Sequence, residues 1–135
     1  MDDQRITTQL MFEGNAEAAM SFYVGLFPDG EILSVQRYGP GDPGPEGTIK
    51  HAAFTLAGQR IQCIDSPASH AFGFTPAMSL FVQCATNEEL EYLYNALIEG
   101  GQALMPLDEY PFSTRYGWVN DRFGVSWQLN YGEVR

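Results

Sequence analysis

The segment NAEAAMSFYVGLFPDG at residues 15–30 has the same pattern as TNEELEYLYNALIEGG at residues 86–101. Both segments start with a good helix N-cap residue, carry glutamate in the first turn and end on glycine. Apolar residues recur between these signals at helical spacing, which predicts two amphipathic helices. At an offset of 71 residues the matched pairs are Asn15 with Thr86, Glu17 with Glu88, Phe22 with Leu93, Tyr23 with Tyr94, Phe27 with Ile98 and Gly30 with Gly101.

The segments around the two helices repeat as well. One β-prone run precedes each helix and three follow it, and the final hairpins match at an offset of 66, Gly58 with Gly124 and Gln62 with Gln128. This order predicts a duplicated βαβββ unit. The predicted strands are 6–12, 32–38, 49–56, 60–65, 78–85, 102–107, 115–120 and 125–131.

Length and composition predict one α+β domain over residues 1–135. The chain has 135 residues, of which 44% are hydrophobic and 18% charged, as in a packed globular protein. Within it we expect a first module at about 5–66, a connector at 67–76 rich in turn residues, and a second module at about 77–132. Two cysteines are too few for a disulfide framework, and we expect Cys63 and Cys84 to be buried thiols.

The negative net charge of the chain limits the kinds of partner that it is expected to bind. The chain has seventeen Asp and Glu residues and seven Lys and Arg residues, which gives a net charge of −10. Nucleic acid and anionic membranes would be repelled by such a surface. The first residues are acidic, and no apolar run approaches the length of a membrane helix. We therefore expect a cytoplasmic protein without a signal peptide that binds neither nucleic acid nor membrane.

Six segments resemble one known family. They are LMFEGNAEAA at 10–19, FY at 22–23, HAAFTL at 51–56, GQR at 58–60, FTPAMSLFV at 74–82 and YGWVNDRFGVSWQL at 116–129. Together they span nearly the whole chain. The sequence resembles the PhnB-like branch of the vicinal oxygen chelate superfamily of glyoxalase- and bleomycin-resistance-like proteins. Members of this branch often carry the label "3-demethylubiquinone-9 3-methyltransferase".

The resemblance implies paired βαβββ modules that form a curved mixed sheet around a pocket for a small molecule, and a homodimer. The methyltransferase label has less support in the sequence. A nucleotide-type cofactor needs a glycine-rich turn between a strand and a helix, and this sequence has no such turn.

Metal-using members of the superfamily place ligands, mostly His and Glu, on the first and last strand of each half. Those positions correspond here to Thr8 or its neighbour Gln9, and to Gln62, Ser79 and Gln128. None of the five has the anionic or imidazole donor that normally fixes a divalent ion. We therefore expect no metal and no other cofactor, and a neutral polar set that hydrogen-bonds a ligand.

Other residues are candidates for the same cavity. Tyr116 and Trp118 lie in an aromatic-rich stretch and could line its wall, while Arg115 could hold a ligand carboxylate or phosphate. His51 could act as a general base, or it could be an ordinary histidine at the start of a strand. His70 lies in the connector, where a solvated loop histidine is the simpler interpretation.

Three hypotheses follow. The first is a metal-free protein that binds a small molecule through an aromatic-lined cavity. The second is an isomerase, a dioxygenase or an antibiotic-modifying enzyme that uses an atypical metal or His51 as base. The third is a dimeric scaffold without a pocket. The sequence identifies neither a ligand nor a reaction.

Overall fold

The computed structural model describes residues 4–134. Residues 1–3, on which the prediction of no signal peptide partly depends, lie outside the described part. The chain divides into two compact units, residues 1–71 and 72–135. The division falls inside the predicted connector, and each unit is described by itself below. Neither described helix is long and apolar enough to cross a membrane.

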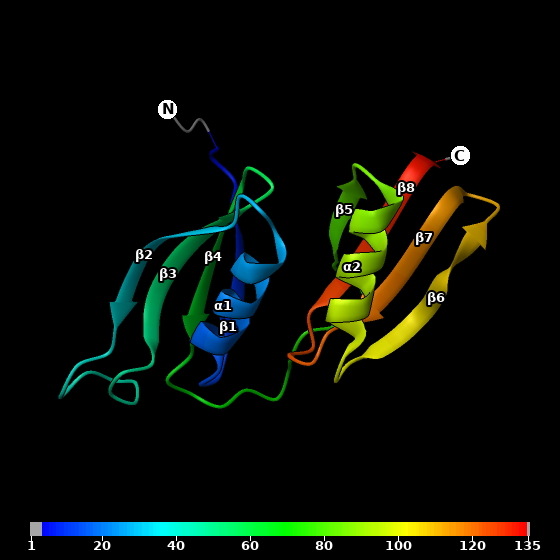
Figure 1. Cartoon of the computed structure of the whole chain (residues 1–135). Coiled ribbons are helices and arrows are strands. Elements are labelled where there is room, and N and C mark those ends of the chain that lie inside the picture. The colour runs from blue at the N-terminus through cyan, green and yellow to red at the C-terminus, as the bar shows by residue number, and fades with distance from the viewer. Residues whose placement is uncertain (1–3, 135) are drawn as a thin grey trace. The chain divides into compact units, whose positions relative to one another are not determined.

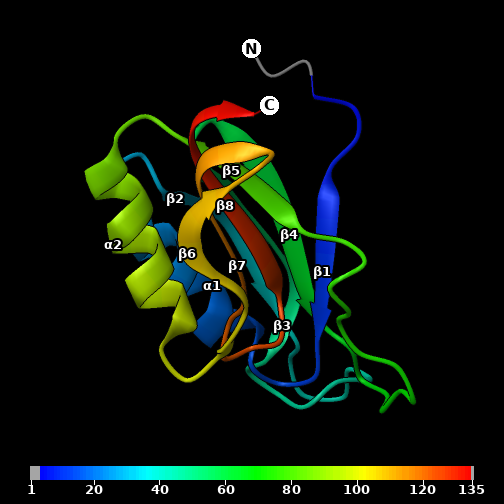
Figure 2. The same cartoon turned by 90° about the vertical axis from the view of Figure 1, so that its right-hand side faces the viewer.

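The first unit has one helix and four strands. Its sheet order is β1-β4-β3-β2, with β1 parallel to β4 and the other pairs antiparallel. Figure 2 shows β1 running alongside β4. The elements are β1 (Thr8–Phe12), α1 (Ala16–Leu26), β2 (Glu31–Arg37), β3 (Ile49–Leu56) and β4 (Gln59–Asp65).

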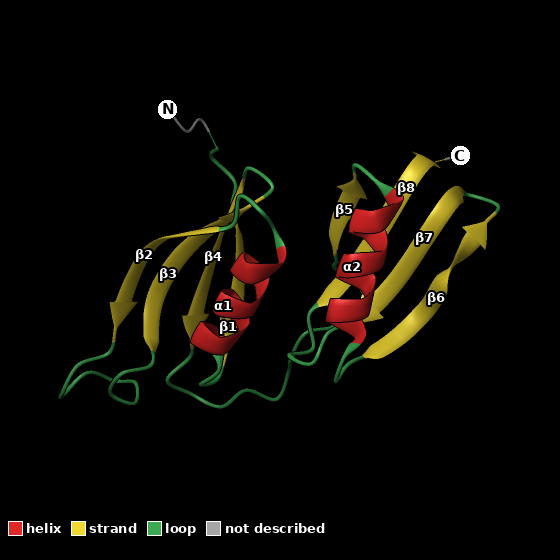
Figure 3. Cartoon of the chain, viewed as in Figure 1, coloured by secondary structure: helices red, strands yellow, loops and turns green. Residues whose placement is uncertain are grey.

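The second unit repeats this topology. Its sheet order is β5-β8-β7-β6, again with one parallel pair, β5 with β8. In each unit the helix packs against one face of its sheet (Figures 1 and 3). The duplicated βαβββ unit and the α+β class are confirmed. The elements are β5 (Leu80–Cys84), α2 (Asn87–Ile98), β6 (Gln102–Tyr110), β7 (Ser113–Asn120) and β8 (Ser126–Val134).

The glycines matched in the sequence have matching roles. Gly30 N donates to Phe27 O at 2.9 Å, and Gly101 N donates to Ile98 O at 2.8 Å, so the same turn ends both helices. A Cβ at either glycine would lie 2.2 Å or 2.1 Å from a backbone oxygen, so no larger residue fits without a shift. In the final hairpins Gly58 and Gly124 have φ values of +80° and +90°, a conformation that favours glycine.

The observed strand bounds differ most from the predicted ones in the second unit. β6 runs to Tyr110, beyond the predicted end at 107, and β7 starts at Ser113 rather than at 115. β6 is an edge strand, where polar residues such as Asp108 and Glu109 are tolerated, and so is Pro106. Its pairing with β7 is irregular around Pro106, where the register shifts between Met105 and Asp108.

The two helices begin differently. Thr86 caps α2 as predicted, since its side chain accepts from Glu89 N at 3.0 Å. Asn15 occupies the N-cap position of α1, but its side chain makes no capping hydrogen bond. Asp65, at the end of β4, provides the acceptor instead, because its Oδ1 accepts from Gly14 N at 2.7 Å and from Ala16 N at 3.0 Å. The predicted side-chain cap by Asn15 is therefore wrong.

Each core lies between the helix and its sheet. In the first unit Met20 and Tyr23 of α1 pack in the core with Phe54, and in the second Leu93 of α2 packs there with Trp127. Cys63 and Cys84 are free and buried, as predicted. Burial is the main reason that the pKa of each thiol rises to about 12, so neither forms a reactive thiolate at neutral pH.

We expect Asp65→Ala to lower the free energy of unfolding by about 3 kcal/mol, because it leaves several buried N–H groups without an acceptor. Besides Gly14 N and Ala16 N, the carboxylate accepts from Ile49 N at 2.9 Å. Urea denaturation measures the change. Asn15→Ala and Asp42→Ala are the controls, and each should cost less than about 1 kcal/mol. A cost for Asn15→Ala as large as that for Asp65→Ala would contradict the capping role of Asp65.

Candidate functional site

One face of the second sheet carries four of the predicted site residues. A Cβ at Gly117 would lie 2.7 Å from the Tyr94 ring of α2, so the odd-numbered positions in the middle of β7 face the helix. Tyr116 and Trp118 therefore project to the opposite face. The register pairs Trp118 with Gln128 on β8, and paired residues share a face. We call this side of the second sheet the helix-distal face.

Hydrogen bonds join the polar side chains of this face into one chain. Tyr116 OH donates to Gln128 Oε1 at 2.5 Å, and Gln128 Nε2 donates to Ser79 Oγ at 3.2 Å. The hydroxyls of Ser79 and Ser126 lie 2.7 Å apart, and Trp118 Nε1 donates to Ser126 Oγ at 2.9 Å. We call these five residues the Gln128 network. Ser126 was not among the predicted site residues, although strand alternation already placed it on the same face as Gln128.

Some donor protons of the Gln128 network are not used by the hydrogen bonds within it. Ser79 and Ser126 contribute two hydroxyl protons, and their mutual hydrogen bond uses only one, whichever serine donates. Gln128 Nε2 carries two protons, of which the bond to Ser79 uses one. Among the hydrogen bonds of the described residues, one hydroxyl proton and one amide proton therefore remain for another acceptor.

Aromatic rings surround the Tyr116 end of the network. The rings of Phe112 and Tyr110 meet that of Tyr116 edge-on, at centroid distances of 4.9 Å and 5.9 Å. Tyr116 is only 4% exposed, and burial is the main reason that the pKa of its phenol is raised. The phenol therefore stays protonated at neutral pH and keeps donating to Gln128. At the β5 end Phe81 is paired with Gln128 and is 53% exposed.

Arg115 lies on the other face of β7, toward the helix. Its Nη2 donates to Glu91 Oε2 of α2 at 3.0 Å. Its Nε is buried and has no hydrogen-bond partner among the described residues. The structure thus places Arg115 on the other face from Tyr116 and Trp118, and its role as a ligand anchor stays a prediction.

In the first sheet the register decides between Thr8 and Gln9. Gln9 is paired with Gln62, whereas Thr8 is paired with the core residue Ile61. Gln9 and Gln62 therefore share a face, and Thr8 lies on the opposite, helix side of β1. His51 lies on the face of Gln62, since Ala53, two residues along β3, is paired with Gln62. No contact tests His51 as a base, and that role stays a prediction.

These residues do not fit a divalent metal ion. Amide and hydroxyl oxygens supply neutral donors, whereas resident metals in proteins are normally fixed by carboxylate, imidazole or thiolate groups. Within residues 4–134 no group of three or more His, Cys, Asp or Glu side chains is placed to hold a metal. We therefore derive no chemistry through a metal.

Comparisons with known proteins agree with this fold. The profile of the family described as "3-demethylubiquinone-9 3-methyltransferase" matches residues 4–130. The solved structure of a PhnB protein from Bacillus cereus is 56% identical, with a TM-score of 0.93, and the match covers 96% of this chain and 100% of that chain.

More distant relatives share the architecture. Protein YjdN of Escherichia coli is 25% identical over 138 residues, which cover 93% of this chain and 93% of YjdN. The fosfomycin resistance protein FosX of Listeria monocytogenes is 15% identical with a TM-score of 0.63, over 98% of this chain and 95% of FosX. That likeness shows the fold alone.

We expect Tyr116→Phe to lower the free energy of unfolding at pH 7 by about 1 kcal/mol, because it removes the hydrogen bond to Gln128. The bond needs a protonated phenol whose folded pKa lies above its ordinary value of about 10. Its stabilisation is therefore complete below pH 10 and is lost as the pH rises through the folded pKa.

Urea denaturation of both proteins at pH 7 and at increasing pH above 10 measures this difference. Tyr92→Phe is the control, because Tyr92 is 55% exposed on α2 and should show no loss. A difference between wild type and Tyr116→Phe that grows with pH would contradict the assignment.

Proposed function

The chain belongs to the family described as 3-demethylubiquinone-9 3-methyltransferase, the PhnB-like branch of the glyoxalase/vicinal oxygen chelate superfamily, and we propose that it binds a small uncharged organic molecule without a metal ion. The proposed ligand carries a hydrogen-bond acceptor, such as a carbonyl oxygen, next to an apolar or aromatic part. The observation that supports this proposal is the Gln128 network on the helix-distal face.

The unused donor protons of the network are the reason that we propose a ligand with a hydrogen-bond acceptor. One serine hydroxyl proton and one Gln128 amide proton remain after the internal bonds are made. Ser126 is 2% exposed, so the partly exposed Ser79 is the better placed of the two serines to donate outward. Because neighbouring side chains already hold these donors in place, binding a ligand's acceptor atom does not cost the entropy of ordering them.

The apolar part comes from the rings at the two ends of the network. Phe112 and Phe81 are 38% and 53% exposed, and an exposed aromatic ring beside fixed donors is a usual component of a small-molecule site. Burying such rings against a ligand is favourable by about 25 cal/mol for each Å² removed from water. The apolar contact would provide affinity, and the donors would fix orientation.

Charge favours an uncharged ligand over an anionic one. The chain has a net charge of −10, which repels anions. Arg115, the cation nearest in sequence to the network, is paired with Glu91 on the other face of β7.

We do not extend the methyltransferase description to this chain. The two strand-to-helix connections are Glu13-Gly14-Asn15 and Ala85-Thr86, and neither has the repeated glycines that admit a nucleotide-type cofactor. The proposal is therefore binding of a small molecule.

Two probes of similar size test the proposal. 7-Methoxycoumarin has a carbonyl acceptor, and 2-methoxynaphthalene lacks one. We expect the coumarin to bind more tightly and to quench Trp118, whereas Trp127 is 1% exposed in the core and should respond little. Gln128→Leu should weaken coumarin binding about tenfold, because a donor is lost, and should leave naphthalene binding nearly unchanged.

Fluorescence titration measures both dissociation constants. Gln102→Leu is the matched control, a glutamine exposed on the edge strand β6 of the same unit, and it should bind both probes like the wild type. Trp118→Phe should abolish most of the quenching. Coumarin binding that Gln128→Leu leaves unchanged, or no binding of either probe at millimolar concentration, would overturn the proposal.

A further inference from the structure

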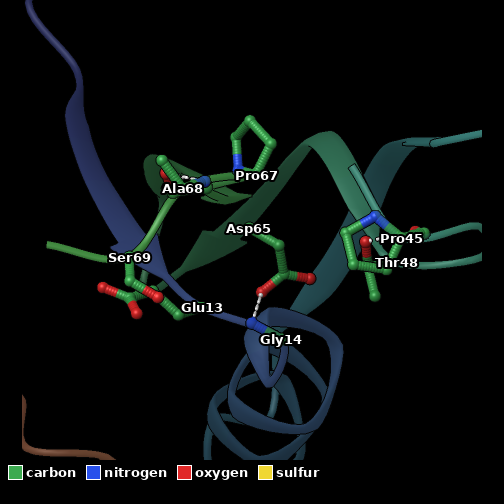
Figure 4. Close-up of a pocket in the computed structure, with 9 residues that line it drawn as sticks. Glu13, Gly14, Pro45, Thr48, Asp65, Pro67, Ala68 and Ser69 are labelled. Atoms are coloured by element: carbon green, nitrogen blue, oxygen red, sulfur yellow. Dashed lines mark hydrogen bonds between the residues drawn. The ribbon is translucent and has the colours of Figure 1, made fainter. Parts of the chain in front are cut away.

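A pocket lies in the first unit, away from the site residues predicted from the sequence. It is a pocket of about 190 Å³ at the turn between β1 and α1, bounded by the loop before β3 and by the segment after β4 (Figure 4). Its lining residues are Glu13, Gly14, Pro45, Thr48, Asp65, Ser66, Pro67, Ala68 and Ser69.

Asp65 forms a fixed wall of this pocket. Both of its carboxylate oxygens accept backbone N–H groups, two at Oδ1 and one at Oδ2. Figure 4 shows the bond to Gly14 at the start of the helix. A carboxylate held in this way orders the pocket and has little capacity left for chemistry.

Ser66 is the side chain in this pocket with a reactive geometry. Its backbone N–H donates to Phe12 O at 2.7 Å, which fixes the residue directly after β4. Its Oγ lies 2.8 Å from His70 Nε2 and also accepts from Ala68 N at 3.2 Å. Because Oγ already accepts one proton from the backbone, the arrangement favours a serine O–H that donates to His70 Nε2.

The backbone of His70 is held by Glu13, a residue of the pocket lining. Its backbone N–H donates to Glu13 Oε2 at 3.2 Å, which ties the connector to the end of β1. Ser66 and His70 are both partly exposed, so a small molecule in the pocket can approach the serine. A hydroxyl in contact with an imidazole is the arrangement that activates serine as a nucleophile.

We propose that Ser66 is a nucleophile that takes the acyl group of a small uncharged ester, with His70 as its general base. Ser66 Oγ forms a bond to the ester carbonyl carbon, and its proton passes to His70 Nε2. The bond from that carbon to the alcohol oxygen breaks as His70 Nε2 gives the proton to that oxygen, and the alcohol leaves. Water then releases the acid from Ser66, and the protonation states of serine and imidazole are restored.

The pocket limits the substrate class. Its volume admits only a short acyl group, and Glu13 and Asp65 in its lining disfavour an anionic one. This activity is independent of the proposed ligand binding in the second unit, since the two sites share no residue. Failure of one proposal therefore leaves the other intact.

p-Nitrophenyl acetate is the test reagent for the full chain. We measure nitrophenolate release by absorbance and locate the acetyl group by peptide mass spectrometry. The wild type should become acetylated at Ser66, or should release nitrophenolate in repeated turnovers if water removes the acetyl group quickly. Ser66→Ala should lose this reaction, and His70→Gln should slow it about 100-fold, because glutamine cannot accept the proton.

Ser21→Ala is the control, since Ser21 is an exposed serine of α1 in the same unit and does not line the pocket. It should react like the wild type. Circular dichroism shows whether each variant is folded, and His70→Asn replaces His70→Gln if the latter is not. Nitrophenolate release that is equal in wild type and Ser66→Ala, or Ser66 acetylation that is equal in wild type and the folded His70 variant, overturns the proposal.

Discussion

Each sheet is covered by its helix on one face, and this constraint determines where the polar side chains of the strands can lie. Alternation along β7 and β8 sends Val119, Trp127 and Leu129 toward α2, where they are buried. The residues between them must then project from the opposite face. Because the two strands pair in a fixed register, that face brings together Tyr116, Trp118, Ser126 and Gln128.

The duplicated unit could be predicted because its signals are local. Helix caps, helical spacing and glycine turns are each contained in a few neighbouring residues. The candidate residues of the second sheet had other sources. The family resemblance implies Ser79 and Gln128, and the aromatic-rich stretch suggests Tyr116 and Trp118, whereas the register of β7 with β8 brings Trp118 and Gln128 onto one face.

Interactions between distant residues could not be predicted in the same way. The start of α1 is capped by Asp65, whose carboxylate accepts a hydrogen bond from Ala16 N. The two residues are 49 positions apart in the sequence. The choice between Thr8 and Gln9 depends on the parallel register of β1 with β4, which no local pattern specifies. The ion pair of Arg115 with Glu91 likewise joins a strand to a helix 24 residues earlier.

The two units also show how one topology supports different chemistry. At the offset of 66 that matches the final hairpins, Asp65 corresponds to Tyr131, so the second unit has no carboxylate at this position and caps its helix with Thr86 instead. The first unit uses that carboxylate to shape a pocket beside Ser66 and His70. The second unit instead joins neutral amide, hydroxyl and indole groups by hydrogen bonds, and under our proposal these groups bind an uncharged ligand.

We propose that neutral donors on the helix-distal face of the second sheet hold a ligand and that the protein needs no metal ion there. Elemental analysis of the purified protein, before and after dialysis against Mn²⁺, Ni²⁺ or Zn²⁺, tests it most directly. We predict far less than one equivalent of any metal per chain, in the wild type and in Gln128→Ala alike. Close to one equivalent of metal in the wild type, lost in Gln128→Ala, would contradict the account.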